Sequence, residues 1–103
     1  MSKDFNLVYR AFVADLISEL RKTLISYGVN PTDKILSEFL RVEPNTVSRL
    51  RRKCFNASPL VLVSLIAAIS PFNFTSVYRK YFADLKSYQN ELFAEFCSED
   101  LTF

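Results

Sequence analysis

Apolar and polar positions alternate at helical spacings along most of the chain, and this pattern predicts about five helices. The first helix is expected over about residues 3–27. Gly28 should end it, because glycine tolerates the left-handed conformation that closes many helices. Its apolar residues recur every three or four positions and would form one broad buried stripe: Phe5, Val8, Phe12, Val13, Leu16, Ile17, Leu20 and Leu24.

Capping residues next to prolines mark the next two helices. Asn30 is expected to cap a helix over about residues 32–41, with Pro31 at its first position. Pro44 starts a third helix over about residues 44–54, so a turn of roughly three residues separates the pair. The inward side chains of the helix over 32–41 are expected to be Ile35, Leu36, Phe39 and Leu40.

The C-terminal half predicts two further helices. Ser58 and Pro59 begin a helix that should end near Ile69 and lie buried, because residues 60–69 are strongly apolar. Pro71 and Asn73 are expected to break the chain before a last helix over about residues 75–97.

Composition agrees with a single all-α domain spanning residues 1–103. The chain holds one Gly and four Pro, too few turn formers for the many tight turns of a small sandwich or barrel. The N-terminus lacks the layout of a signal peptide, and residues 60–69 are too short an apolar run to span a bilayer. We therefore expect a cytoplasmic protein without membrane association.

The absence of histidine excludes several kinds of site. A zinc finger or a His-based catalytic triad needs histidine ligands or bases, and the two cysteines, Cys54 and Cys97, lack zinc-ligand spacing. Both thiols are expected to be reduced, with a disulfide between them as the less favoured alternative. No nucleophile–base pair or phosphate-binding loop is visible, so we expect no enzyme activity, no metal and no cofactor.

The charges are unevenly distributed along the chain. Residues 41–53 carry five basic side chains and one acid, Glu43, whereas residues 84–103 carry five acids and one base, Lys86. A basic segment followed by an acidic tail suggests contact with nucleic acid, although a charged cluster alone can simply be a solvated face.

Residues 34–53 combine two short helices, a tight turn and a basic second helix. This is the helix-turn-helix arrangement, in which apolar residues hold the second helix on the first. In DNA-binding proteins of this kind, the second helix enters the major groove with its N-terminal residues near base edges. Neighbouring arginines and lysines contact phosphates.

Residues 36–50, LSEFLRVEPNTVSRL, resemble the lambda-repressor-like helix-turn-helix family of phage and bacterial regulators. The family pattern usually reads Leu-Ala-x-x-Leu-Gly-Val-Ser-x-x-Thr-Val-Ser-x-Leu. The similarity extends over roughly residues 20–70, because residues 57–69 are similar to the next helix of the family. Two positions depart from the pattern: Arg41 replaces the turn glycine, and Glu43 replaces the usual Ser or Thr cap. The positions that match are Ser37, where the helices touch, and the apolar Val42, Val47 and Leu50.

The resemblance implies roles for the second helix of the motif. Asn45 could pair with adenine and Arg49 with guanine, although Asn45 could instead only support the helix start. The base-contacting positions would be Pro44, Asn45, Ser48 and Arg49, and the phosphate contacts Arg41, Thr46, Arg51, Arg52 and Lys53.

The last helix carries more aromatic residues than one buried stripe requires. These residues could complete the core, or they could form a homodimer interface, since such DNA-binding proteins commonly bind two half-sites as dimers. We expect a dimeric transcriptional regulator that binds double-stranded DNA. The alternative is a protein-interaction module on the same scaffold, such as an antirepressor or regulator-binding protein of a phage, plasmid or bacterium. The expected interface residues are Tyr78, Tyr81, Phe82, Leu85, Tyr88, Leu92, Phe93 and Phe96.

Overall fold

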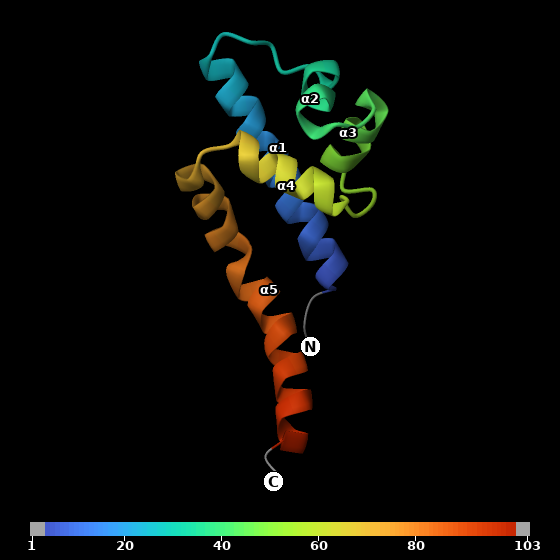
Figure 1. Cartoon of the computed structure of the whole chain (residues 1–103), viewed down its shortest axis with the longest axis vertical. Helices are drawn as coiled ribbons and strands as arrows, with labels where there is room; N and C mark the ends of the chain where they lie inside the picture. The colour runs from blue at the N-terminus through green and yellow to red at the C-terminus, as the bar shows by residue number, and fades with distance from the viewer. Residues whose placement is uncertain (1–3, 101–103) are drawn as a thin grey trace.

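The long first helix organises the fold, and the remaining helices pack around it. The computed structural model describes residues 4–100, and all regular secondary structure within them is helical. This confirms the predicted all-α fold with about five helices. In chain order (Figure 1) the helices are α1 (Phe5–Ser26), α2 (Asp33–Leu40), α3 (Pro44–Arg51), α4 (Pro59–Ala68) and α5 (Pro71–Asp100).

The start of α2 differs from the prediction. Its cap is Thr32, whose Oγ1 accepts a hydrogen bond from the N–H of Ile35 at 3.2 Å. Asn30 lies outside the helix, and its carbonyl accepts from the N–H of Thr32 at 2.9 Å in the preceding turn. The roles predicted for Asn30 and Pro31 were therefore wrong, because a second good cap lies two residues further along the chain.

The break predicted at Pro71 and Asn73 is also wrong. Pro71 is the first residue of α5, and the N–H of Asn73 donates to Ser70 Oγ at 3.1 Å, in the manner of a helix cap. Proline suits this position because the first N–H groups of a helix have no intrahelical partner. The cap predicted at Ser58 is confirmed, since its Oγ accepts from the N–H of Val61 at 3.4 Å.

The core lies along the side of α1 that faces α3, α4 and α5. Leu16 and Ile17 are fully buried in the middle of this helix. Burial of its apolar stripe supplies most of the helix stability, because helix propensity alone is a weak force. The other helices, and Ile69 just after α4, complete the core; the buried residues are Leu36, Leu40, Val47, Leu50, Val61, Leu65, Ile69 and Val77.

Helix α4 is only half buried, contrary to the prediction. Leu60, Val63 and Ile66 are 56%, 61% and 42% exposed, while the opposite side of the helix enters the core. Phe39 of α2, also predicted to point inward, is 42% exposed. Together with Arg41, these helices line an open apolar groove. A predominantly apolar helix normally signals complete burial, but among the described residues α4 packs mainly on α1 and α2, and its outer face stays uncovered.

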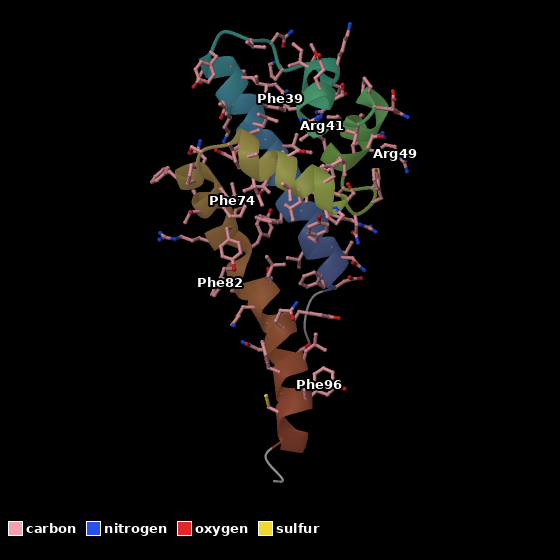
Figure 2. All side chains as sticks on the ribbon, in the orientation of Figure 1. Phe39, Arg41, Arg49, Phe74, Phe82 and Phe96 are labelled. Atoms are coloured by element: carbon pink, nitrogen blue, oxygen red, sulfur yellow. The ribbon has the colours of Figure 1, made fainter. Side chains whose placement is uncertain are left out.

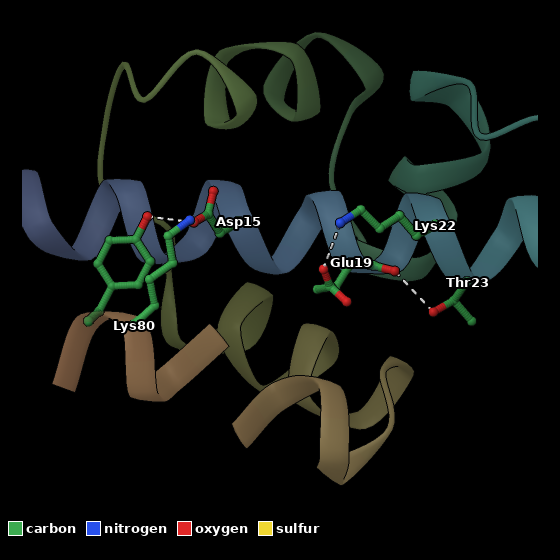
Figure 3. A network of polar contacts seen from close by, with 6 residues as sticks. Asp15, Glu19, Lys22, Thr23 and Lys80 are labelled. Atoms are coloured by element: carbon green, nitrogen blue, oxygen red, sulfur yellow. Dashed lines mark hydrogen bonds and ion pairs between the residues drawn. The ribbon is translucent and has the colours of Figure 1, made fainter. Parts of the chain in front are cut away.

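Polar and aromatic contacts fasten α5 to α1. The Tyr81 hydroxyl donates to Asp15 Oδ2 at 2.6 Å, and Lys80 Nζ lies 3.0 Å from the same oxygen (Figure 3). Partial burial by itself would raise the pKa of Asp15, but these hydrogen bonds and the charges of Lys80 and Lys53 lower it below 3.8. Burial and the neighbouring carboxylate raise the pKa of Tyr81 to about 12.

The molecule is elongated because α5 outgrows the rest of the fold. The molecule measures 59 × 27 × 22 Å along its principal axes. Figure 1 shows the C-terminal part of α5 projecting past the N-terminal end of α1. The last contact between rings of the two helices joins Phe5 and Tyr88, with centroids 4.9 Å apart. None of the helices in the part of the chain described here has the length and apolar character needed to cross a membrane.

Candidate nucleic-acid interface

The helix pair α2–α3 is fixed by a small buried cluster. Leu36 and Leu40 of α2 and Val47 of α3 are fully buried, and Leu50 is nearly so. Ser37 stands at the buried contact between the helices, and its hydroxyl donates to the carbonyl of Lys34. A small side chain that satisfies its own hydroxyl allows close packing without an unpaired polar group.

The turn after α2 closes through a left-handed residue. Arg41 has φ 60° and ψ 41°, and its N–H donates to the carbonyl of Ser37. The N–H of Val42 donates to the same carbonyl at 3.2 Å. This second hydrogen bond is typical of the Schellman ending, in which glycine is the preferred left-handed residue. Arg41 thus adopts the glycine conformation without the freedom of glycine.

The end of α3 repeats this closure with another basic residue. Lys53 has φ 62°, its N–H donates to the carbonyl of Leu50 at 3.0 Å, and the N–H of Cys54 donates to the carbonyl of Arg49 at 3.0 Å. The helix therefore ends at Arg51 rather than near Cys54 as predicted. A positive charge beside the last carbonyls of a helix is favourable, which partly offsets the strained backbone.

The residues assigned to base contact share one side of α3. With 3.6 residues per turn, Pro44, Asn45, Ser48 and Arg49 lie on one face, and Val47 lies on the buried face. Pro44, Asn45 and Arg49 are exposed, and Ser48 is half buried. Glu43 precedes the helix as its cap residue, and its side chain makes no capping hydrogen bond. The helix itself contains no acidic residue.

Two arginines on this side are held by neighbouring groups. Arg49 Cζ lies 4.8 Å from the centroid of the Phe55 ring, a cation–π contact that orients the guanidinium. Arg52 Nε donates to the carbonyl of Ser48 at 3.3 Å. Figure 2 shows Arg49 at the rim of the molecule, far from Phe96 at the other end. A guanidinium in such a contact can still donate hydrogen bonds from its N–H groups to an acceptor.

The remaining predicted phosphate contacts differ in their surroundings. Arg51 Nη2 lies 2.8 Å from Asp33 Oδ1, so α3 is tied to the start of α2 and part of the Arg51 charge is neutralised. Arg41 and Lys53 are exposed, and Thr46 is half buried. The structure thus gathers five exposed basic residues around α3, of which Arg51 is paired with Asp33; the other four are Arg41, Arg49, Arg52 and Lys53.

Sequence reasoning missed the contacts that hold the segment after α3. Asn56 Nδ2 donates to Asn6 Oδ1 at 2.9 Å, and Arg10 Nε donates to Asn56 Oδ1 at 2.9 Å. The Tyr9 hydroxyl donates to the carbonyl of Ala57 at 2.8 Å, and burial raises the pKa of that hydroxyl. These partners are far apart in the sequence, so no local pattern reveals them.

The residues predicted as a dimer interface fall into two groups. Tyr81, Leu85, Tyr88 and Leu92 are half buried. The exposed group comprises Tyr78, Phe82, Phe93 and Phe96. Both cysteines are free and exposed.

Comparison with known proteins adds no family. No protein-family model matches the chain, and no curated protein or solved structure matches it. The resemblance to the lambda-repressor-like family therefore stays a hypothesis that rests on residues 36–50 and on the similar helix over residues 57–69. Within the described part of the chain, no group of three or more His, Cys, Asp or Glu side chains could hold a metal ion.

Proposed function

We propose that the protein is a sequence-specific DNA-binding transcriptional regulator that places α3 in the major groove. The observation that carries the proposal is the division of α3 into two faces. One face is locked on α2 by Val47 and Leu50, and the other presents Asn45, Ser48 and Arg49 to solvent. A groove-reading helix needs this combination of a rigid support and an uncovered polar face.

The charges around α3 support the same function. Arg41 and Lys53 follow the ends of α2 and α3, and Arg52 continues the exposed face. Phosphate contacts from such residues would supply most of the affinity without sequence preference. The guanidinium of Arg49, in contact with the Phe55 ring, carries N–H groups that can donate two hydrogen bonds to the edge of a guanine.

A gel-shift titration of duplex DNA over a salt series tests the proposal. We expect binding whose logarithm falls steeply and linearly with the logarithm of the salt concentration. Arg52→Ala should weaken binding to all sequences and lower the salt slope by about 1. Arg49→Ala should weaken binding to a site selected from a random library by about tenfold or more, and it should relax the preference at one base pair.

Lys22→Ala is the matched control. Its side chain is 71% exposed on α1 and pairs with Glu19 at 3.2 Å, so the variant removes one positive charge away from α3. Equal losses in Lys22→Ala and Arg52→Ala would mean that only net charge matters, and α3 would not be the contact surface. An absence of binding at low salt would refute the proposal outright.

A protein-interaction module on the same scaffold is the second candidate function. It is favoured by the open apolar groove between α2 and α4, where Phe39, Leu60 and Val63 are exposed beside Arg41. The Asp33–Arg51 ion pair also reduces the positive charge available to phosphates. Two results together would fit this function: the protein fails to bind DNA at low salt, and Val63→Asp abolishes its binding to another protein.

A further inference from the structure

One side of α5 carries a repeat typical of a helix that pairs with another helix. Its members alternate at spacings of four and three residues, which is the pattern of the a and d positions of a coiled coil. A single polar residue, Gln89, interrupts an otherwise apolar or aromatic series. The series runs Tyr78, Phe82, Leu85, Gln89, Leu92 and Phe96.

Among the described side chains, this stripe lacks a complete partner. Phe82 and Phe96 are 45% and 62% exposed, and Phe93 beside them is 61% exposed. The contact with α1 runs mainly along the neighbouring side of the helix, through Tyr81 and Tyr88. Of the stripe itself, Tyr78 also contacts α1, with its ring centroid 6.3 Å from that of Phe12. An open groove along the stripe is lined by Phe5, Tyr78, Leu85, Lys86, Gln89 and Phe93. Side chains of a second helix could enter this groove.

The charge along α5 changes sign from one half to the other. The N-terminal half, residues 71–85, carries Arg79 and Lys80 against Asp84, and Lys80 is already paired with Asp15 of α1. The C-terminal half is acidic on balance, because Glu91 and Glu95 stand against Lys86. Two such helices side by side in the same direction would place like charges together. In opposite directions, the basic half of each would face the acidic half of the other.

We propose that two copies of this chain dimerise through an antiparallel pair of α5 helices. The stripe is symmetric about residue 87, so every a position meets a d position of the second copy. Tyr78 packs against the partner's Phe96, and Phe82 packs against the partner's Leu92. Leu85 meets the partner's Gln89, a polar layer that specifies the register. The proposal does not depend on DNA binding by α3.

Sedimentation of the full chain at micromolar concentration tests the dimer. We expect a dimer, and Phe96→Glu should raise its dissociation constant at least about tenfold, because a charge then enters the buried stripe. The matched control is Ala94→Glu, which adds the same charge on the opposite, exposed side of the projecting end of α5. Phe96 lies beyond the ring contact of α5 with α1, so the fold of the monomer should survive the change.

Cysteine cross-linking tests the direction of the helices. In a background with Cys54→Ser and Cys97→Ser, Phe82→Cys and Leu92→Cys are prepared separately and mixed before oxidation. The antiparallel pair predicts a disulfide only between the two different variants. Like variants cannot join in the antiparallel dimer, because two copies of position 92 lie about 15 Å apart along the axis. In a parallel pair, equivalent positions lie side by side, so like variants would join instead.

Each result decides the proposal. A dimer that is weakened by Phe96→Glu but not by Ala94→Glu, with mixed disulfides only, supports it. A monomer, or a dimer that Phe96→Glu leaves intact, overturns the pairing through α5. Disulfides between like variants overturn the antiparallel direction. Circular dichroism of each cysteine variant verifies that the helical fold is retained.

Discussion

Arg41→Gly should make the protein more stable, although it removes a side chain. Arg41 has φ 60° and ψ 41°, in the left-handed region that glycine enters without steric penalty. Its side chain is exposed, so little packing is lost when it is removed. The substitution therefore isolates the backbone strain of a single turn.

The expected gain is the difference between one stabilising contribution and two destabilising ones. The left-handed conformation costs a residue with a Cβ about 1–2 kcal/mol. Glycine cancels roughly 0.5–1 kcal/mol of this gain, because the unfolded glycine variant has more conformational freedom, which is lost on folding. Loss of the positive charge after α2 costs about 0.3 kcal/mol more at this exposed site. The net stabilisation is about 0.5 kcal/mol relative to the natural chain.

Arg41→Ala provides the sharper comparison. It loses the same charge but keeps the Cβ, so the free energy of unfolding of Arg41→Gly should exceed that of Arg41→Ala by about 1 kcal/mol. Urea unfolding followed by circular dichroism at 222 nm measures the difference, which corresponds to about 0.5–1 M in the midpoint. All variants are compared at one protein concentration, since dimerisation would contribute to apparent stability. Equal midpoints for the glycine and alanine variants would refute the strain argument.

Three further predictions concern the core and the polar contact between α1 and α5. Leu16→Ala should lower the free energy of unfolding by about 2–5 kcal/mol, because Leu16 is fully buried, and urea unfolding measures the loss. The lowered pKa of Asp15 stabilises the fold above pH 3.8, and this contribution disappears as the pH falls through the folded value. The stability difference between the natural chain and Asp15→Asn should therefore shrink under acid; a constant difference would contradict the assignment. Tyr81 should ionise at a pKa of about 12 in absorbance titration at 295 nm, and Tyr81→Phe should remove that late step. The stabilisation from the raised pKa of Tyr81 is complete below pH 10.0 and is lost as the pH rises through about 12.

Periodicity was sufficient to predict the long helices and most of the core. The three- and four-residue spacing of α1 depends on local geometry, so the buried stripe around Leu16 and Leu20 is visible in the sequence. The helix starts were harder, because Asn30 and Thr32 are both good caps and only the folded chain selects Thr32. Proline can either end a helix or begin one, so the sequence alone suggested a break at Pro71, where α5 begins.

The prediction that α4 is buried failed because it depended on the number of neighbouring elements. Residues 60–69 are apolar on all sides, which usually indicates a buried helix, yet Val63 is 61% exposed. Similarly, the pairing of Arg51 with Asp33 depends on how α2 and α3 cross, and no local spacing encodes it. The exposed face of α3 was predictable because it needs only the helix period and two buried residues.

The two left-handed basic residues suggest why glycine is absent from the turns after α2 and α3. Arg41 and Lys53 occupy positions where glycine would be more stable, yet each places a positive charge at a helix end beside the exposed face of α3. If this face binds DNA as proposed, Arg41→Gly should weaken binding and reduce its salt dependence while it stabilises the fold. Changes of opposite sign in stability and in affinity distinguish a strained functional residue from a purely structural one. A glycine variant with unchanged affinity would assign Arg41 to the turn alone.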